Sequence, residues 1–555
     1  MFTGPALSQP ASIDTQEQRR AQERERVLRE QQENAPDERR TSPAPAEAAR
    51  LPTEASCVVI QQLGIKTVAG DSSPASRWDW ALDAAAGPAN DDSPLRRCVG
   101  TEGINLILKR VQDAVMARGY STTRVLLEPQ DLHNGVMMLT VLPGRIRAIR
   151  FAEPVDARAN AWNAVAAQPG DILNLRDIEQ ALENFKRVPT AQADIQVAPG
   201  ETPGQSDLVI SYKQALPLRL SLSADDSGAK STGKYQGSTT LSFDNPLALN
   251  DLLYFSFNGD LGGGLDGERG TRGRTVHYSV PYGYWLLGAT ASYNHYHQNV
   301  AGFSQDYVYS GTSSNLEFKL SRLVYRDAAR KTTASLAAFR RSSNNFIDDT
   351  EVEVQQRKVG GWQAALNHRE FIAESTLDTT LTYKRGTGAF DSLPAPEEAF
   401  GEGTSRFRLV TLDLGLTTPF QLAGQKFKYN ASARIQANRS PLTPQDRFAI
   451  GGRYTVRGFD GESSLSAERG WLLRNDMGVM LGDSGQELYA GLDYGQVGGP
   501  SSDFLLGKHL AGAVIGLRGS LKKLQYDIFV GRPLRKPEGF VTARSTAGVS
   551  LNFSL

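Results

Sequence analysis

The strongest constraint on the fold is an alternation of apolar and polar residues with a period of two, which runs from about residue 216 to the C-terminus. Because successive side chains of a β-strand point to opposite faces, this period predicts strands with one apolar and one polar face. The segment KFKYNASARIQAN shows it clearly, with Phe427, Tyr429, Ala431, Ala433, Ile435 and Ala437 on one face and Lys428, Asn430, Ser432, Arg434, Gln436 and Asn438 on the other. About 16 such segments, with an uncertainty of about two, lie between turn signals.

These strands are more consistent with a transmembrane barrel than with a soluble sandwich. Tight turns alternate with longer loops, and the strands lack the dense apolar core that a sandwich needs. The apolar share of the chain is only 40%, and no run of about 18 apolar residues predicts a spanning helix. We therefore expect residues 216–555 to form an antiparallel transmembrane β-barrel in contact with lipid, with an aqueous lumen.

The preceding residues read as two small α+β units, at 55–143 and 144–214. Each combines strands with one amphipathic helix, whose apolar faces are Ile104, Ile107, Leu108, Val111 and Val115 in the first and Ile178, Leu182 and Phe185 in the second. Exposed sheet edges of such units suit the capture of an extended polypeptide by strand addition. Small α+β domains are common, however, and most have no such role.

Residues 11–35 are rich in Gln, Glu and Arg, which favour a helix. Their sizeable apolar residues are only Ile13, Val27 and Leu28, so this helix has no face for an apolar core. It is either a solvated helix or tail, or a helix lodged in a polar cavity. Residues 36–54 would then be a flexible linker. The opening MFTGPALSQP lacks a basic region followed by an apolar core, so no signal peptide is expected there.

The chain has two cysteines, Cys57 and Cys98, and six histidines. Their spacing fits no metal pattern. A disulfide is favoured over two free buried thiols, and closing such a loop would contribute on the order of 4 kcal/mol in an oxidising compartment.

The stretch IGGRYTVRGFDGE, residues 450–462, lies in the longest segment without clear alternation, 439–469. In the strand ELYAGLDYGQV the apolar face places Asp493 in the lumen, between Gly491 and Gly495, which leave room for a close approach to the wall. If the long loop folds inward, Arg457 could form a bidentate pair with Asp493. Alternatively, Arg457 caps an exposed turn and Asp493 is one polar lumen residue among many.

VRGF (Val456, Arg457, Gly458 and Phe459) followed by GLDYG resembles the paired loop and strand motifs of the outer-membrane assembly and two-partner secretion superfamily. Over residues 11–555 the chain resembles the TpsB transporters of two-partner secretion. GYSTTRV, PQDLHNG, VLPGRI and the placement of the two cysteines are similar to that family as well. One departure is the terminal Leu555, where outer-membrane proteins often end in Phe; Phe553 lies two positions earlier on the same face.

The resemblance implies a sixteen-stranded barrel in the bacterial outer membrane, a plug helix at 11–35 and two periplasmic POTRA (polypeptide-transport-associated) domains. It implies that Arg457 pairs with Asp493 to hold the loop inside the pore. It also implies a large β-helical exoprotein of the TpsA type (a haemolysin, adhesin or contact-dependent inhibition toxin), engaged by the POTRA domains and threaded unfolded. We expect a monomer without cofactor or metal.

Other functions fit the sequence less well. The formal net charge is zero, so nucleic acid is not an obvious partner. An enzyme is not expected, since GxSxG, HExxH and clustered histidines are absent and Asp91 and Asp92 read as solvated linker charge. A passive porin would not need about 200 N-terminal residues. A barrel-assembly insertase shares the loop motif but has no role for the N-terminal helix.

Overall fold

A computed structural model describes residues 10–33, 36–40 and 49–555. Within these residues, sixteen antiparallel strands close into a barrel in which the last strand, β27, pairs with the first, β9. The expected number of strands is therefore confirmed. The barrel strands are β9 Leu218–Asp225, β10 Tyr235–Asp244, β11 Leu252–Gly262, β12 Arg269–Tyr282, β13 Trp285–Ala301, β14 Asp306–Arg326, β15 Arg330–Ile347, β17 Arg357–Ile372, β18 Ser375–Thr387, β19 Arg408–Leu422, β20 Gln425–Asn438, β23 Arg469–Met480, β24 Glu487–Gly498, β25 His509–Leu521, β26 Leu524–Arg535 and β27 Thr546–Ser554.

The barrel is inside out relative to a soluble protein. In β11 the side chain of Phe257 is exposed on the outer face, whereas Tyr254 and Ser256 are buried on the inner one. The inner face carries hydroxyl pairs such as Thr240 with Ser256, whose oxygens lie 2.9 Å apart. Apolar side chains therefore face lipid and polar ones face the lumen, as the alternation predicts.

Short strands and 3-10 helices lie in the barrel loops. A two-residue strand extends the hairpin after β15, and the long loop between β20 and β23 contains its own small β-ladder. These elements are β16 Thr350–Glu351, η2 Glu353–Gln355, η3 Pro396–Phe400, η4 Pro444–Asp446, β21 Phe448–Ile450, β22 Leu465–Ala467 and η5 Pro500–Phe504.

The first α+β domain packs one helix on a three-stranded sheet of order β2-β5-β4. Ile107, Val111 and Val115 of α2 are fully buried, and Trp78 from a 3-10 segment completes this core. Its elements are β1 Val58–Val59, β2 Gln62–Thr67, η1 Ala75–Ala86, β3 Cys98–Val99, α2 Thr101–Ala117, β4 Arg124–Leu126 and β5 Val136–Leu142.

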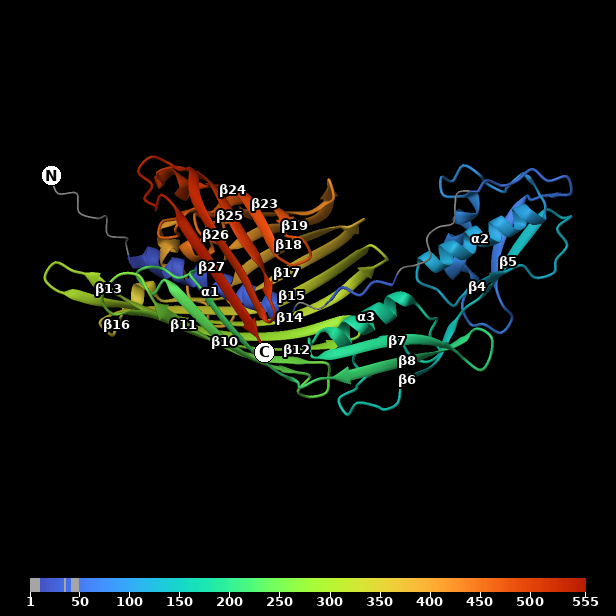
Figure 1. Ribbon diagram of the computed structural model, residues 1–555, viewed down its shortest axis with the longest axis horizontal. Coiled ribbons are helices and arrows are strands. Elements are labelled where there is room, and N and C mark those ends of the chain that lie inside the picture. The colour runs from blue at the N-terminus through green and yellow to red at the C-terminus, as the bar shows by residue number, and fades with distance from the viewer. Residues whose placement is uncertain (1–9, 34–35, 41–48) are drawn as a thin grey trace.

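The second α+β domain repeats this arrangement directly beside the barrel (Figure 1). Its sheet has the order β6-β8-β7, and Ile178, Leu182 and Phe185 of α3 form the buried helix face. The same core includes Leu252 and Tyr254 of the barrel. The elements are β6 Arg145–Phe151, α3 Leu175–Lys186, β7 Ala191–Pro199 and β8 Gln205–Gln214.

One further helix, α1 Pro10–Gln32, runs through the barrel (Figure 1, dark blue). Among the described helices, none is long and apolar enough to cross a membrane.

Candidate functional site

The centre of the site is Arg457, which the loop between β20 and β23 carries into the barrel. Its Nε donates to Oδ2 of Asp493 at 2.7 Å, and its Nη2 donates to Oδ1 of the same carboxylate at 2.7 Å. The backbone N–H of Arg457 also donates to Asp493 Oδ2, at 2.9 Å. Both side chains are almost completely buried. The loop is thus fixed to β24 by a bidentate, charge-assisted contact and a backbone hydrogen bond.

The glycines of the strand motif make this approach possible. A Cβ at Gly491 would lie 2.7 Å from Nη2 of Arg457, and a Cβ at Gly495 would lie 2.9 Å from Val456. Gly458 has a φ of +93°, and a Cβ there would lie 2.5 Å from the carbonyl oxygen of Arg532. Larger residues at these positions would push the loop away from the wall.

The apolar residues of the loop motif form a second, independent contact. Val456 and Phe459 lie in a buried cluster between the loop and the barrel wall, and the rings of Phe459 and Phe540 meet edge to face at 5.9 Å. The other members of the cluster are Phe448, Ile450, Leu465, Ala467, Leu472, Val497 and Leu510. The loop and the barrel wall therefore share a small apolar core.

Asp476 is a second carboxylate partner of Arg457, and it is not among the residues predicted from the sequence. Asp476 lies opposite Gly491 in the register of β23 and β24, and its Oδ2 accepts from Nη1 of Arg457 at 3.3 Å. Arg518 binds Asp476 at 3.2 Å and Glu487 at 2.6 Å. The alternation of WLLRNDMGVM predicts that Asp476 lies on the lumen face, but its contact with Arg457 depends on the register of β23 and β24.

Helix α1 occupies the lumen through polar contacts on several sides. Nη2 of Arg19 donates to the carbonyl of Pro444 at 2.5 Å and to Oγ of Ser466 at 2.8 Å, so α1 contacts the inward loop directly. Nη1 of Arg29 lies 2.7 Å from Glu317 on the wall. Further contacts to the loop or the wall are made by Glu17, Arg20, Glu23 and Glu25.

A cavity of about 460 Å³ remains between α1, the inward loop and the wall. Charged side chains line much of it, including Arg19, Glu23, Asp226, Arg434 and Arg453. Space lined by charged groups therefore remains in the lumen beside α1. Nowhere in the described chain do three or more His, Cys, Asp or Glu side chains gather as a metal site requires.

Two carboxylates of α3 tie the second domain to the barrel. The side chains of Glu179 and Glu183 on α3 each bind Arg326, at the periplasmic end of β14, at 3.0 Å. They also accept hydrogen bonds from the backbone N–H groups of Arg40 and Glu38, at 2.6 and 3.2 Å. One acidic helix face therefore holds both the barrel turn and the chain that leads to α1.

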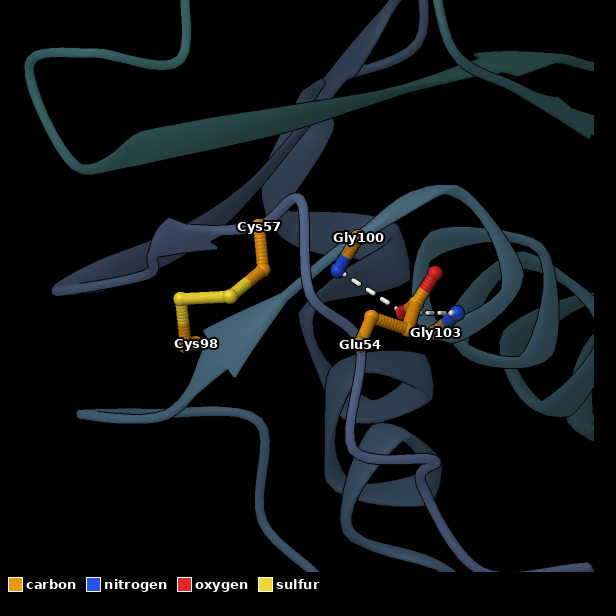
Figure 2. Close-up of a disulfide and its surroundings, with 5 residues drawn as sticks. All are labelled: Glu54, Cys57, Cys98, Gly100 and Gly103. Carbon is orange, nitrogen blue, oxygen red and sulfur yellow. Dashed lines mark hydrogen bonds between the residues drawn. A yellow bond between two sulfur atoms is a disulfide. The ribbon is translucent and has the colours of Figure 1, made fainter.

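In the first domain, Cys57 and Cys98 form a disulfide next to a helix start (Figure 2). The carboxylate of Glu54 accepts hydrogen bonds from the backbone N–H groups of Gly100 at 2.8 Å, Glu102 at 2.9 Å and Gly103 at 3.0 Å. Burial by itself would raise the pKa of Glu54, but these donors lower it below its ordinary value. The disulfide thus joins the strand before α2 to the segment whose carboxylate caps that helix.

The interpretation of Asp92 as solvated linker charge is wrong. Asp92 is buried and accepts hydrogen bonds from Nη2 of Arg110 at 2.6 Å and from the backbone N–H of Leu51 at 2.8 Å. Burial opposes ionisation, but the contacts with Arg110, Leu51 and Arg97 lower the pKa of Asp92 to about 2. Two of these partners, Leu51 and Arg110, lie 41 and 18 positions away in the chain, so the local sequence does not indicate the burial of Asp92. Asp91 does remain half exposed, where it binds Arg50 at 2.8 Å.

Comparisons with known proteins agree with this architecture. A family model described as haemolysin secretion/activation protein ShlB/FhaC/HecB matches residues 204–519. Models of a POTRA domain and of a ShlB-type POTRA domain match residues 145–199 and 84–144.

Individual relatives extend the match to nearly the whole chain. The outer membrane transporter CdiB-2 of Burkholderia pseudomallei (strain 1026b) is 38% identical over 551 residues, which cover 97% of this chain and 93% of the relative. The outer membrane transporter CdiB of Dickeya dadantii (strain 3937) is 29% identical, with 80% and 79% covered. The solved structure of CdiB from Acinetobacter baumannii superimposes with a TM-score of 0.85 at 28% identity, covering 99% of this chain and all of that one.

Proposed function

This chain belongs to the ShlB/FhaC/HecB family of outer-membrane transporters that serve two-partner secretion, and we propose that it exports a large β-helical exoprotein captured by its POTRA domains. The barrel lies in the outer membrane and the POTRA domains lie in the periplasm. The exoprotein would cross the lumen unfolded, and a single chain would suffice, because the barrel strands close on themselves.

The observation that carries this proposal is the way in which the lumen is filled. A lumen filled by part of the barrel wall, or by a tightly packed apolar core, would be closed permanently. Here α1 makes polar contacts to the wall and the inward loop, and water and polar groups of a client can replace these contacts at low cost. A polar helix of this kind is a removable plug.

We propose that capture begins at the sheet edge β7 of the second POTRA domain. β7 pairs only with β8 in the described sheet, so its other side is open to an added strand. Nη2 of Arg40 donates to the carbonyl of Ile195 in β7 at 2.7 Å. A client strand that binds this edge would displace Arg40 and so disturb the chain that leads to α1.

The energy for export comes from the client. No phosphate-cradling GxxxxGK[ST] occurs in the sequence, which gives no sign of a nucleotide site. Folding of the emerged client outside the cell would then bias its movement outward, while the plug leaves the lumen.

A tether between α1 and the wall tests this mechanism. Glu25 of α1 accepts a hydrogen bond from Oγ of Ser292 on β13 at 2.9 Å. In cells that also make the exoprotein encoded beside this gene, Glu25→Cys with Ser292→Cys would be bridged by a short bis-maleimide. We expect the bridged protein to stop secreting the exoprotein, whereas a mono-functional maleimide leaves secretion intact.

A second cysteine pair provides the matched control. Ser314 and Ser342 lie on neighbouring wall strands with their oxygens 2.8 Å apart, and a bridge between them leaves α1 free. Secretion should continue in this control at equal outer-membrane abundance. Undiminished secretion through a barrel with tethered α1 would exclude plug exit.

A further inference from the structure

An exposed tryptophan marks the loop between β6 and α3. Trp162 leaves 70% of its surface exposed, whereas the next two residues, Asn163 and Ala164, are buried. Tryptophan is rarely left so exposed in water without a partner, because it carries the largest apolar surface of any side chain. We therefore expect the indole of Trp162 to contact a partner.

The loop holds this tryptophan in a fixed place. Nδ2 of Asn160 donates to the carbonyl of Ala248, in the turn between β10 and β11, at 2.8 Å. Nδ2 of Asn163, which is buried, donates to the carbonyl of Pro281 near the end of β12 at 3.0 Å. Trp162 is thus clamped between two neighbouring periplasmic turns.

The indole lies on the outer side of the barrel wall. In β12 the outward face alternates with the buried one and includes Val276 and Tyr282, both exposed. The ring of Trp162 packs edge to face on Tyr282, with the ring centres 5.3 Å apart. Trp162 therefore continues the face of the wall that contacts lipid, at its periplasmic end.

Other exposed apolar side chains lie at the same rim. We define the rim patch as Trp162, Leu216, Leu247, Tyr282 and Trp285, whose exposed fractions are 70%, 74%, 63%, 56% and 39%. These residues belong to the second POTRA domain and to the periplasmic ends of consecutive strands, from the start of β9 to the start of β13.

Positive charge accompanies this patch. The guanidinium of Arg322 lies over the ring of Trp285 at 4.9 Å, so an arginine side chain covers part of the patch. Aromatic side chains with neighbouring arginines are typical of the boundary between lipid headgroups and water. The rim patch has this composition and is continuous with the lipid-facing band of the wall.

We propose that the rim patch docks on the periplasmic leaflet of the membrane, with Trp162 inserted among the phospholipid headgroups. The second POTRA domain is then anchored twice, by its polar contacts to the barrel turns and by lipid. A client is a poorer occupant, because it passes through the lumen, and the rim patch lies on the opposite side of the wall.

Tryptophan fluorescence tests this docking in the full-length protein, reconstituted in nanodiscs. The emission of Trp162 is obtained as the difference between the intact protein and Trp162→Phe. We expect phospholipid brominated near the headgroup end of its acyl chains to quench this difference emission, relative to unbrominated lipid, while aqueous iodide quenches it weakly.

Trp80 provides the matched control, because it lies in the first POTRA domain, with the guanidinium of Arg118 3.6 Å from its ring centre. The difference emission for Trp80→Phe should be insensitive to brominated lipid. If Trp162 is quenched by iodide and not by brominated lipid, the docking is refuted. Shielding of Trp162 that requires added exoprotein would also refute it, in favour of a client surface.

Discussion

At the scale of single residues, the inward loop depends on one guanidinium shared by two carboxylates. Replacing Arg457 with Ala leaves Asp493 and Asp476 buried without this partner, which costs on the order of 3–5 kcal/mol. Opening of the loop should then become about 150- to 5000-fold more frequent. Hydrogen exchange of the amides of residues 451–464 would measure this change, and secretion should fall with it.

Two further variants make this prediction specific. Arg457→Lys keeps the charge but loses the bidentate geometry, so we expect an intermediate effect. Arg406→Ala removes an exposed arginine from another loop and should leave both exchange and secretion unchanged. Normal exchange in Arg457→Ala would mean that the apolar cluster around Phe459 alone holds the loop.

The sequence indicated only part of this residue network. Alternation placed Asp493 in the lumen, and the flanking glycines suggested a close approach to the wall. From the residues alone the pairing is one of two alternatives, because a period of two cannot say which loop folds inward, and the resemblance favours it. Asp476 satisfied the same alternation, but its role depends on the register between β23 and β24, which one sequence does not reveal.

At the scale of elements, α1 lies in the lumen without an apolar face and is held there by polar contacts. A helix of 23 residues is about 35 Å long and about 10–12 Å wide with its side chains, enough to fill much of the lumen along the membrane. We expect deletion of residues 10–32 to raise single-channel conductance in planar bilayers. Deletion of residues 41–48, which lie outside the described residues, is the control for shortening the chain and should change conductance little.

The composition of α1 predicts that it is a helix but does not predict where the helix lies. Its residues favour a helix, and the absence of an apolar stripe excludes a place in an ordinary core. Both a solvated helix and a helix in a polar cavity satisfy that pattern. The difference lies in partners such as Glu317 and Ser292, which are hundreds of positions away in the chain. Conductance equal to that of the intact protein would contradict its role as a plug.

At the scale of the whole molecule, Arg326 connects the barrel to the second POTRA domain. Arg326→Ala leaves the buried carboxylates of Glu179 and Glu183 with fewer partners, so the domain should detach more often from the barrel. We expect faster hydrogen exchange in α3 and in residues 36–40. Arg330→Ala removes a half-exposed arginine of the same turn that binds Asp327, and it should leave exchange in α3 unchanged.

The contacts between the α+β domains and the barrel were the feature that the sequence predicted least. The two α+β units and the barrel could be read separately, since each has its own periodicity. Their contacts join single charged residues across about 140 positions, and no local pattern distinguishes Arg326 from the other arginines of the barrel. Unchanged exchange in α3 of the Arg326 variant would assign the attachment to the shared apolar core around Tyr254 instead.

The position of α1 inside the barrel also fixes an order of biogenesis. The partners of α1 lie between Thr232 and Asn552, on wall strands and on the inward loop, and the barrel is complete only when β27 meets β9. The first described residues to leave the ribosome are therefore among the last to reach their native place. The native contacts of α1 are therefore complete only when the wall around it is complete.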